Sequence, residues 1–294
     1  MPYQTGSFSS FADLQTTVES FCTTNGWTLT AGVLAKAGCH VKVISDASNR
    51  LLINVGDGDD GFGTLTNPVP YTFRMLTSRA GQSISFPATY HLFSLSDPEH
   101  IFLVINYNVS WCQHMAFGNV KKYGTWSGGQ IASSTFYSDT STQKVPDYYT
   151  YFYSTYSING GGAYLYFIRK RINYTANPSA GMLCDIDDVS WLVNTDGSAP
   201  EGVGVFAGAS LAMPYLNKSN SINLQPAMFP AILTMSRPSN LRSVIATVPH
   251  VRYLRVDNYQ PGDIIEVGSQ KWMVFPHISV SFNGAGWAIK YDGP

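Results

Sequence analysis

The sequence predicts a mainly β protein in which antiparallel sheets form a sandwich or barrel-like core, with one N-terminal helix and a small C-terminal β-hairpin subdomain. Three observations lead to this class. Beyond the one helix, the chain contains many short apolar runs bounded by Gly, Pro, Asn and Asp, and such runs of about four to eight residues are typical of strands. Only one segment has helical periodicity. Two turn signals near the C-terminus indicate tight hairpins.

The single helix is expected directly after residue 10. Four apolar residues share one helical face: Phe11, Leu14, Val18 and Phe21. Ser10 and Asp13 have the spacing of a capping box, in which hydroxyl and carboxylate accept hydrogen bonds from the first-turn N–H groups. Asn25-Gly26 ends the helix, because glycine accepts the left-handed conformation there. Trp27 then begins extended chain.

Strands account for most of the chain beyond the helix. They are expected at His40–Ser45, Leu51–Val55, Tyr71–Leu76, Thr89–Leu95, Ile101–Tyr107, Ser110–Phe117 and Tyr164–Arg169. The segment Asp57–Gly63 is expected to be a loop. Residues 200–238 are rich in Pro, Gly, Ala and Met and have poor periodicity, which indicates an extended arm or loops packed on a neighbour.

Residues 241–294 are expected to form a subdomain of their own, packed on a main domain that spans residues 1–240. Its first hairpin joins Asp263–Val267 to Gln270–Phe275 through Gly268-Ser269. Glycine at the first turn position predicts a positive φ at Gly268. Trp272 is expected in a small local core, after a turn at Pro261-Gly262.

A second hairpin is expected in the same subdomain. It would join His277–Phe282 to Gly286–Tyr291 around Asn283-Gly284.

Composition points to assembly rather than chemistry. Charged residues make up 13% of the chain, where about 25% is usual, and a surface of hydroxyls, amides and Tyr suits a subunit that contacts other proteins. The net charge of −1 offers no basic groove for nucleic acid. The first basic residue is Lys36, so we expect no signal peptide. The longest nearly uncharged apolar stretch, Gly202 to Leu216, contains Gly and Pro and is too short to span a bilayer, so we expect no membrane span and synthesis in a cytoplasm.

The sequence contains only weak indications of metal binding or of cysteine chemistry. Four cysteines, Cys22, Cys39, Cys112 and Cys184, lack zinc-finger spacing and are expected to be buried thiols, with disulfides as the alternative. Asp57, Asp59 and Asp60 fail the EF-hand pattern, which leaves a solvated turn or an irregular cation site.

Three histidines on consecutive strands, His91, His100 and His114, would hold zinc if they converged, and His91 and His100 are expected as cross-strand partners. The alternative is bonding to backbone carbonyls. Cys112 and His114 share a strand face, which is a weak signal for a thiol and its base. We predict no metal and no cofactor.

Two further clusters are candidate sites. Asp185, Asp187 and Asp188 precede Ser190-Trp191 and are either a polar turn before a strand or the acids of a sugar site. An aromatic run consists of Tyr148, Tyr149, Tyr151, Phe152, Tyr153 and Tyr156. Tyrosine gives large contact area at low entropy cost, so this run is an interface candidate, with internal packing and glycan stacking as alternatives.

Two stretches of the chain resemble a family of virion structural proteins of tailed bacteriophages. One runs from Phe117 to Gly129 and includes Trp126; the other comprises Tyr259–Ile265, Lys271–Pro276 and Gly286–Pro294. The resemblance covers about half the chain, mainly residues 86–130 and 250–294. Its Gly, Trp and Pro motifs are structural, so the resemblance implies a context in the head-to-tail neck or tail and no catalysis.

The resulting hypothesis is a structural, non-enzymatic subunit of the virion, located in its neck or tail. It would form a ring with itself, six-fold rather than twelve-fold, at the collar, gateway or tail-terminator position. It would contact neighbouring neck or tail proteins and let DNA pass without binding it specifically. The alternatives are a baseplate or tail-tip ring, a host-glycan-binding tail protein and, third, a tail-borne glycan hydrolase.

Overall fold

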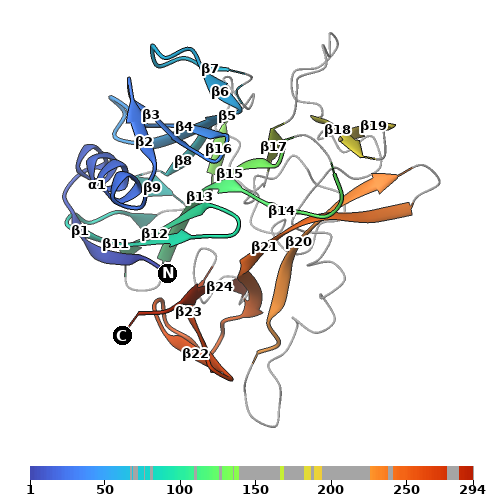
Figure 1. The fold of residues 1–294 in the computed structure, drawn as a ribbon. Coiled ribbons are helices and arrows are strands. Elements are labelled where there is room, and N and C mark those ends of the chain that lie inside the picture. The colour runs from blue at the N-terminus through green and yellow to red at the C-terminus, as the bar shows by residue number, and fades with distance from the viewer. Residues whose placement is uncertain are drawn as a thin grey trace.

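The described residues form three six-stranded antiparallel sheets, three two-stranded ribbons and one helix, in the mainly β class that the sequence predicts (Figure 1). The computed structural model describes residues 1–66, 68, 72–75, 77–79, 82–108, 111–125, 128–134, 136–138, 166–168, 182–186, 189–193, 226–237, 241–276 and 285–293. A central sheet lies between the helix-side sheet and the C-terminal sheet (Figure 1). Within the described part of the chain, no helix is both long and apolar enough to cross a lipid bilayer.

The central sheet is covered on both faces. In spatial order its strands are β1 (Tyr3–Phe8), β11 (Ala88–Leu95), β12 (His100–Asn108), β13 (Trp111–Asn119), β15 (Gln130–Ser134) and β17 (Tyr166–Ile168). Seven consecutive residues of β13, Cys112 to Gly118, are buried. Alternate residues of a strand face opposite sides of its sheet, so an unbroken buried run requires a covering layer on each side.

The helix-side sheet supplies one of these layers. In spatial order its strands are β16 (Phe136–Ser138), β8 (Thr72–Met75), β5 (Leu51–Gly56), β4 (Cys39–Ser45), β3 (Val33–Lys36) and β2 (Thr28–Thr30). Its inward residues alternate along the strands, as Cys39, Val41 and Val43 do in β4. They join apolar residues of the central sheet, such as Leu92 and Leu103, in the main hydrophobic core.

Helix α1 (Phe11–Thr24) packs into the same core. The four predicted apolar residues, Phe11, Leu14, Val18 and Phe21, are all buried. The Ser10 hydroxyl accepts a hydrogen bond from the Asp13 N–H, as expected of the N-cap. The Asp13 carboxylate, however, accepts from the Ser9 N–H and not from Ser10, so the capping box is shifted by one residue. Gly26 has φ +83° and ends the helix.

The C-terminal sheet covers the other face of the central sheet. Its strands are β14 (Lys121–Lys122), β20 (Phe229–Arg237), β21 (Leu241–Arg255), β22 (Ile264–Val267), β23 (Gln270–Pro276) and β24 (Ala285–Tyr291). Three two-stranded ribbons complete the described elements: β6 (Gly58–Asp59) with β7 (Leu65–Thr66), β9 (Ser78–Arg79) with β10 (Gln82–Ser83), and β18 (Met182–Ile186) with β19 (Val189–Val193).

The first C-terminal hairpin is confirmed. Strands β22 and β23 pair with Val267 opposite Gln270, and Gly268 has φ +61°. Gly262 also has a positive φ, +92°, and its N–H donates to the Val274 carbonyl. Trp272 is buried in a small core formed by Leu254, Val256, Ile265, Val274 and Ala288. The turn and the local core are therefore placed as predicted.

The pairing expected for the second hairpin is wrong. β24 lies between β21 and β23, with Tyr253 opposite Trp287 on one side and Phe275 opposite Trp287 on the other. Both edges of β24 are thus occupied by strands other than the expected one. Residues 277–284 lie outside the described residues.

The C-terminal part of the segment 200–238, which was expected to be an extended arm or loops, is a β-strand. Strand β20 occupies Phe229–Arg237 and pairs with β21 along most of its length, whereas residues 200–225 lie outside the described part. The expected boundary at residue 240 therefore falls between two paired strands of one sheet.

We predict that Gly268→Val lowers the free energy of unfolding by more than about 1 kcal/mol, because a β-branched residue resists a positive φ. Chemical denaturation at pH 7 measures this. Gly268→Asn is the matched control and should cost less, since Asn tolerates the left-handed region. Equal stability of the Val variant and the parent would contradict the turn geometry.

Candidate functional site

The three predicted histidines lie on one face of the central sheet, but they do not meet. His91 and His114 both stand opposite Val104, on either side of it. His100 stands opposite Leu95. The expected pairing of His91 with His100 is therefore wrong, because residues 96–99 form the turn between β11 and β12 and this turn sets the register.

Each histidine is held by a different group. His91 Nδ1 shares a hydrogen bond of 2.8 Å with the Tyr3 hydroxyl, and His114 Nε2 donates to the Pro276 carbonyl at 2.8 Å. The backbone of Asn119 hydrogen-bonds His100. Among the described residues, no group of three or more His, Cys, Asp or Glu is arranged to hold a metal ion. The imidazoles thus act as separate polar ties.

Aromatic rings from the C-terminal sheet lie beside His91 and His114. The Phe275 ring lies 4.9 Å from that of His91 and 6.5 Å from that of His114, centroid to centroid. Trp287 lies 6.2 Å from Phe102 and 6.5 Å from His114. This set, which we call the histidine–aromatic layer, joins the central sheet to the C-terminal sheet.

A fourth histidine ties the same two sheets at their margin. His250 Nε2, on β21, donates to the Ser96 carbonyl in the turn between β11 and β12 at 2.7 Å. His250, Phe275 and Trp287 are not among the residues predicted to form a site. In the sequence, these residues are marked only by the apolar and aromatic character of the segments that contain them. That character does not indicate which face of which sheet the segments cover.

Burial keeps the central imidazoles neutral. Loss of hydration lowers the pKa of His91 to about 4 and that of His100 to about 4, and the charge of His250 further opposes protonation of His100. A neutral imidazole keeps one N–H donor and one acceptor nitrogen, so each ring can still form the hydrogen bond that holds it.

The thiols are enclosed as well. Cys22, Cys39 and Cys112 are buried and free, and burial raises the pKa of each thiol. Cys112 Sγ donates to the Asn106 side chain. A thiol held protonated in this way is a poor nucleophile, so the pair formed by Cys112 and His114 is a packing feature. The expectation of buried thiols is confirmed for these three cysteines; the side chain of Cys184 is outside the described set.

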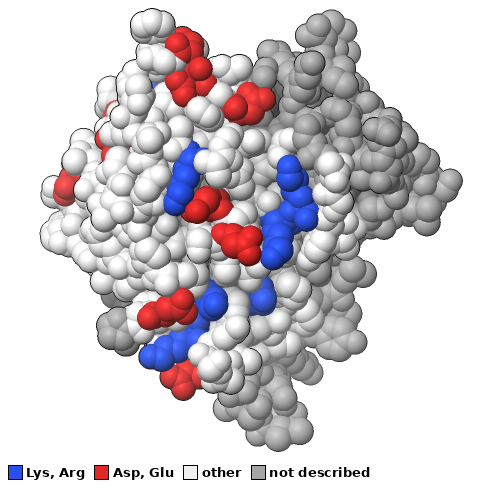
Figure 2. All heavy atoms as spheres, in the orientation of Figure 1, with Lys and Arg blue, Asp and Glu red and all other residues white. Residues whose placement is uncertain are grey.

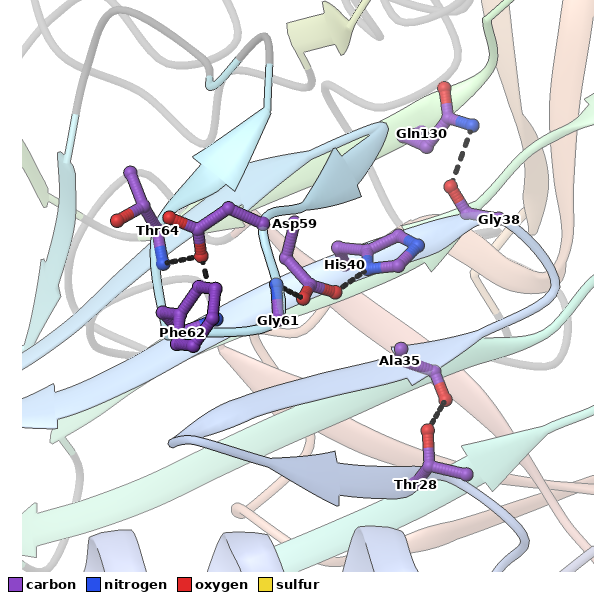
Figure 3. A network of polar contacts seen from close by, with 10 residues as sticks. Thr28, Ala35, Gly38, His40, Asp59, Gly61, Phe62, Thr64 and Gln130 are labelled. Atoms are coloured by element: carbon purple, nitrogen blue, oxygen red, sulfur yellow. Dashed lines mark hydrogen bonds and ion pairs between the residues drawn. The ribbon is translucent and has the colours of Figure 1, made fainter.

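The acidic segment Asp57–Gly63, expected to be a loop, contributes the short strand β6 and then a braced turn that leads to β7 (Figure 3). Asp60 accepts hydrogen bonds from the Phe62 and Thr64 N–H groups, and these bonds lower the pKa of its carboxyl. Asp59 accepts from the Gly61 N–H and, at 2.6 Å, from His40 Nδ1. The carboxylates thus fix backbone and histidine groups, which agrees with the turn interpretation.

This turn is also fastened to its surroundings. Lys42 Nζ donates to the Gly63 carbonyl at 2.8 Å. Gly63 has φ +95°, and a Cβ there would lie 2.6 Å from the Ala31 carbonyl, so only glycine fits. The bracing presents Phe62, whose residue surface is 91% exposed, to solvent. An exposed aromatic on an ordered turn is a feature that sequence reasoning missed, since a lone Phe in a loop has no periodicity.

The remaining predicted residues are only partly described. Asp185 and Trp191 belong to the β18–β19 ribbon, opposite Ser190 and Cys184 respectively, which places strands around the expected polar turn. Asp187 and Asp188 lie outside the described residues, as do Trp126 and the interface candidates Tyr148, Tyr149, Tyr151, Phe152, Tyr153 and Tyr156.

No protein-family model and no curated protein matches the chain.

We predict that stability falls as the pH drops from about 7 to 5. The unfolded chain binds protons at His91 and His100 near pH 6.5, whereas the folded chain binds them only near pH 4. Stability is therefore complete above pH 6.5 and lost toward pH 4. The expected loss between pH 7 and 5 is about 2 kcal/mol for each histidine.

Urea unfolding at several pH values measures this loss. His100→Gln, which does not titrate, should reduce the slope of stability against pH, while an exposed control substitution, Ser20→Gln, should leave it unchanged. A stability that is flat between pH 7 and 5 would contradict the buried neutral state.

We predict that Phe62→Ala leaves the melting temperature unchanged, because the ring makes almost no contact within the chain. Differential scanning calorimetry measures this, and Phe11→Ala, which removes a fully buried ring, should cost about 3–5 kcal/mol. A large loss with Phe62→Ala would show that the ring packs on the chain itself.

Proposed function

We propose that the chain is a structural subunit of a tailed-bacteriophage virion. It forms a ring around the DNA channel at the head-to-tail neck, with six copies rather than twelve, and contacts itself and neighbouring neck or tail proteins. DNA passes without specific binding. The chain carries out no catalysis in this role.

The observation that carries the proposal is that the histidine and cysteine side chains, which could support chemistry, are engaged in packing and hydrogen bonds inside the molecule. His91 and His100 are bound within the central sheet, His114 binds the C-terminal sheet, and the described cysteines are enclosed. Side chains that elsewhere support metal or nucleophile chemistry are thus occupied in packing. A subunit that acts by geometry needs such an interior, because it must keep its shape under contact from several sides.

The surface supports the same role. On the face shown in Figure 2, most of the described surface is uncharged, and the charged side chains of both signs lie near one another in its middle and lower parts. Apolar side chains are exposed at separate places on the molecule, including Phe62 on its braced turn, Val267 beside the β22–β23 turn and Leu29 on edge strand β2. Aromatic and apolar groups on a charge-poor surface favour protein contacts.

The resemblance to phage virion proteins falls on structurally central parts of the chain. Its C-terminal stretches form β23, β24 and the turn at Gly262, and β23 ends at the Pro276 carbonyl that binds His114. The resembling motifs thus lie in the C-terminal sheet and in its contact with the central sheet, which supports a shared architecture rather than a shared reaction.

We predict that an antibody to this chain labels the neck of virions that contain it, where the ring joins head to tail. Negative-stain microscopy of labelled particles measures the position, and antibody pre-absorbed with the purified chain is the control. Label at the tail tip would favour the baseplate or glycan-binding alternative, and unlabelled virions would reject the proposal.

The enzyme alternative has its own test. The purified chain should release no product from peptidoglycan, capsule or lipopolysaccharide. Hydrolysis that is abolished by Asp187→Ala or Asp188→Ala would replace the structural role with a glycan hydrolase.

A further inference from the structure

Strand β1 is an open edge of the central sheet. It pairs with β11 along Tyr3–Phe8, and the described strands include no neighbour on its other side. Figure 1 shows β1 at the outer margin of the sheet, beside α1. Gln4, Thr5 and Ser7 are exposed, so the free edge faces solvent.

The register shows which backbone groups are free. The Ser94 N–H donates to the Pro2 carbonyl at 3.0 Å, and in an antiparallel ladder every second residue bonds the same neighbour. Gln4, Gly6 and Phe8 therefore bond β11. Tyr3, Thr5 and Ser7 direct their N–H and C=O groups away from the sheet, which makes three consecutive bonding positions on one edge.

This edge lacks the features that normally prevent strand pairing. Natural edges carry charges, prolines or bulges, or are very short. β1 has six residues, no charge, no proline and an unbroken register. Edge strand β22, by contrast, has four residues and carries Glu266. β1 is therefore a surface suited to accepting another strand.

We propose that β1 pairs with β1 of a second copy of this chain, antiparallel about a two-fold axis at Thr5. In this register Thr5 opposes Thr5, and Tyr3 opposes Ser7 of the other copy. All three outward-facing residues are used, which gives about six backbone hydrogen bonds. The strand is complementary to itself, because no like charges oppose one another and a Thr–Thr pair is favourable.

This two-fold dimer is the state of the free subunit before it assembles into the ring. A two-fold contact uses the same surface on both copies and closes at two, whereas a cyclic ring joins different surfaces. The pair therefore cannot persist as a contact between ring neighbours. It covers an edge that would otherwise template aggregation, and it does not depend on the position of the protein in the virion.

Sedimentation velocity of the purified chain tests this inference. The parent should sediment at twice the 32.2 kDa mass of the chain. Thr5→Lys places two like charges opposite each other and should halve that mass, as should Thr5→Glu. Ser20→Lys, which adds the same charge at an exposed position of α1, should leave the mass unchanged.

Mixing the Lys and Glu variants should restore the pair, because opposite charges then face each other at the axis. This outcome also shows that both variants are folded, although each loses the hydrogen bond from the Thr5 hydroxyl to the Tyr90 carbonyl.

Oxidation of single-cysteine variants tests the register. Directly opposed residues have Cα atoms about 5.5 Å apart, within the range of a disulfide, so Thr5→Cys should cross-link. Ser7→Cys should not, because Ser7 opposes Tyr3. A monomeric parent, an unchanged mass in Thr5→Lys, or equal cross-linking of the two variants overturns the inference. Each of these results leaves the neck proposal intact, since that rests on labelling of virions.

Discussion

The structure depends on one constraint, which is that the central sheet is buried on both faces. An antiparallel sheet commonly leaves one face to water, but the unbroken buried run of β13 shows that this sheet does not. One face is covered by α1 and the helix-side sheet, and the other by the C-terminal sheet. Folding of the N-terminal and C-terminal parts of the chain is thereby coupled, because the loss of either covering layer would expose one apolar face of the central sheet to water.

Polar residues on the second buried face explain how the layers are aligned. Apolar packing alone is non-directional, so two aromatic surfaces can slide with little loss. The hydrogen bond from His114 to the Pro276 carbonyl is directional and joins the central sheet to the C-terminal sheet, whereas the bond between His91 and Tyr3 fixes the imidazole within the central sheet. His250 adds a second tie between the two sheets, at their margin. These bonds favour one arrangement of the sheets, and the same burial makes that arrangement sensitive to acid.

Local features of the fold could be predicted from the sequence, and distant pairings could not. The apolar face of α1 and the glycine turn at Gly268 are encoded within a few residues, and both are confirmed. β1 was missed because its partner, β11, lies far along the chain. The second hairpin was placed wrongly because the Asn283-Gly284 signal suggested a tight turn, whereas β24 pairs with β23, which ends at Pro276, and with the more distant β21. The candidate histidines could be identified from the residue type and the predicted strands. Their hydrogen-bond partners could not be predicted, because these partners lie on other strands.

The double covering also determines how the molecule can meet other proteins. Once both faces of the central sheet are occupied, its contribution to any contact is confined to its edges, where backbone groups remain available. Edge β1 offers such groups without charge, while the Asp59 and Asp60 turn holds Phe62 clear of the chain. A backbone edge supplies directional bonds, and an ordered aromatic supplies apolar area at low entropy cost. The main hydrophobic core, which joins the helix-side sheet to the central sheet, connects the elements that carry these two contact features.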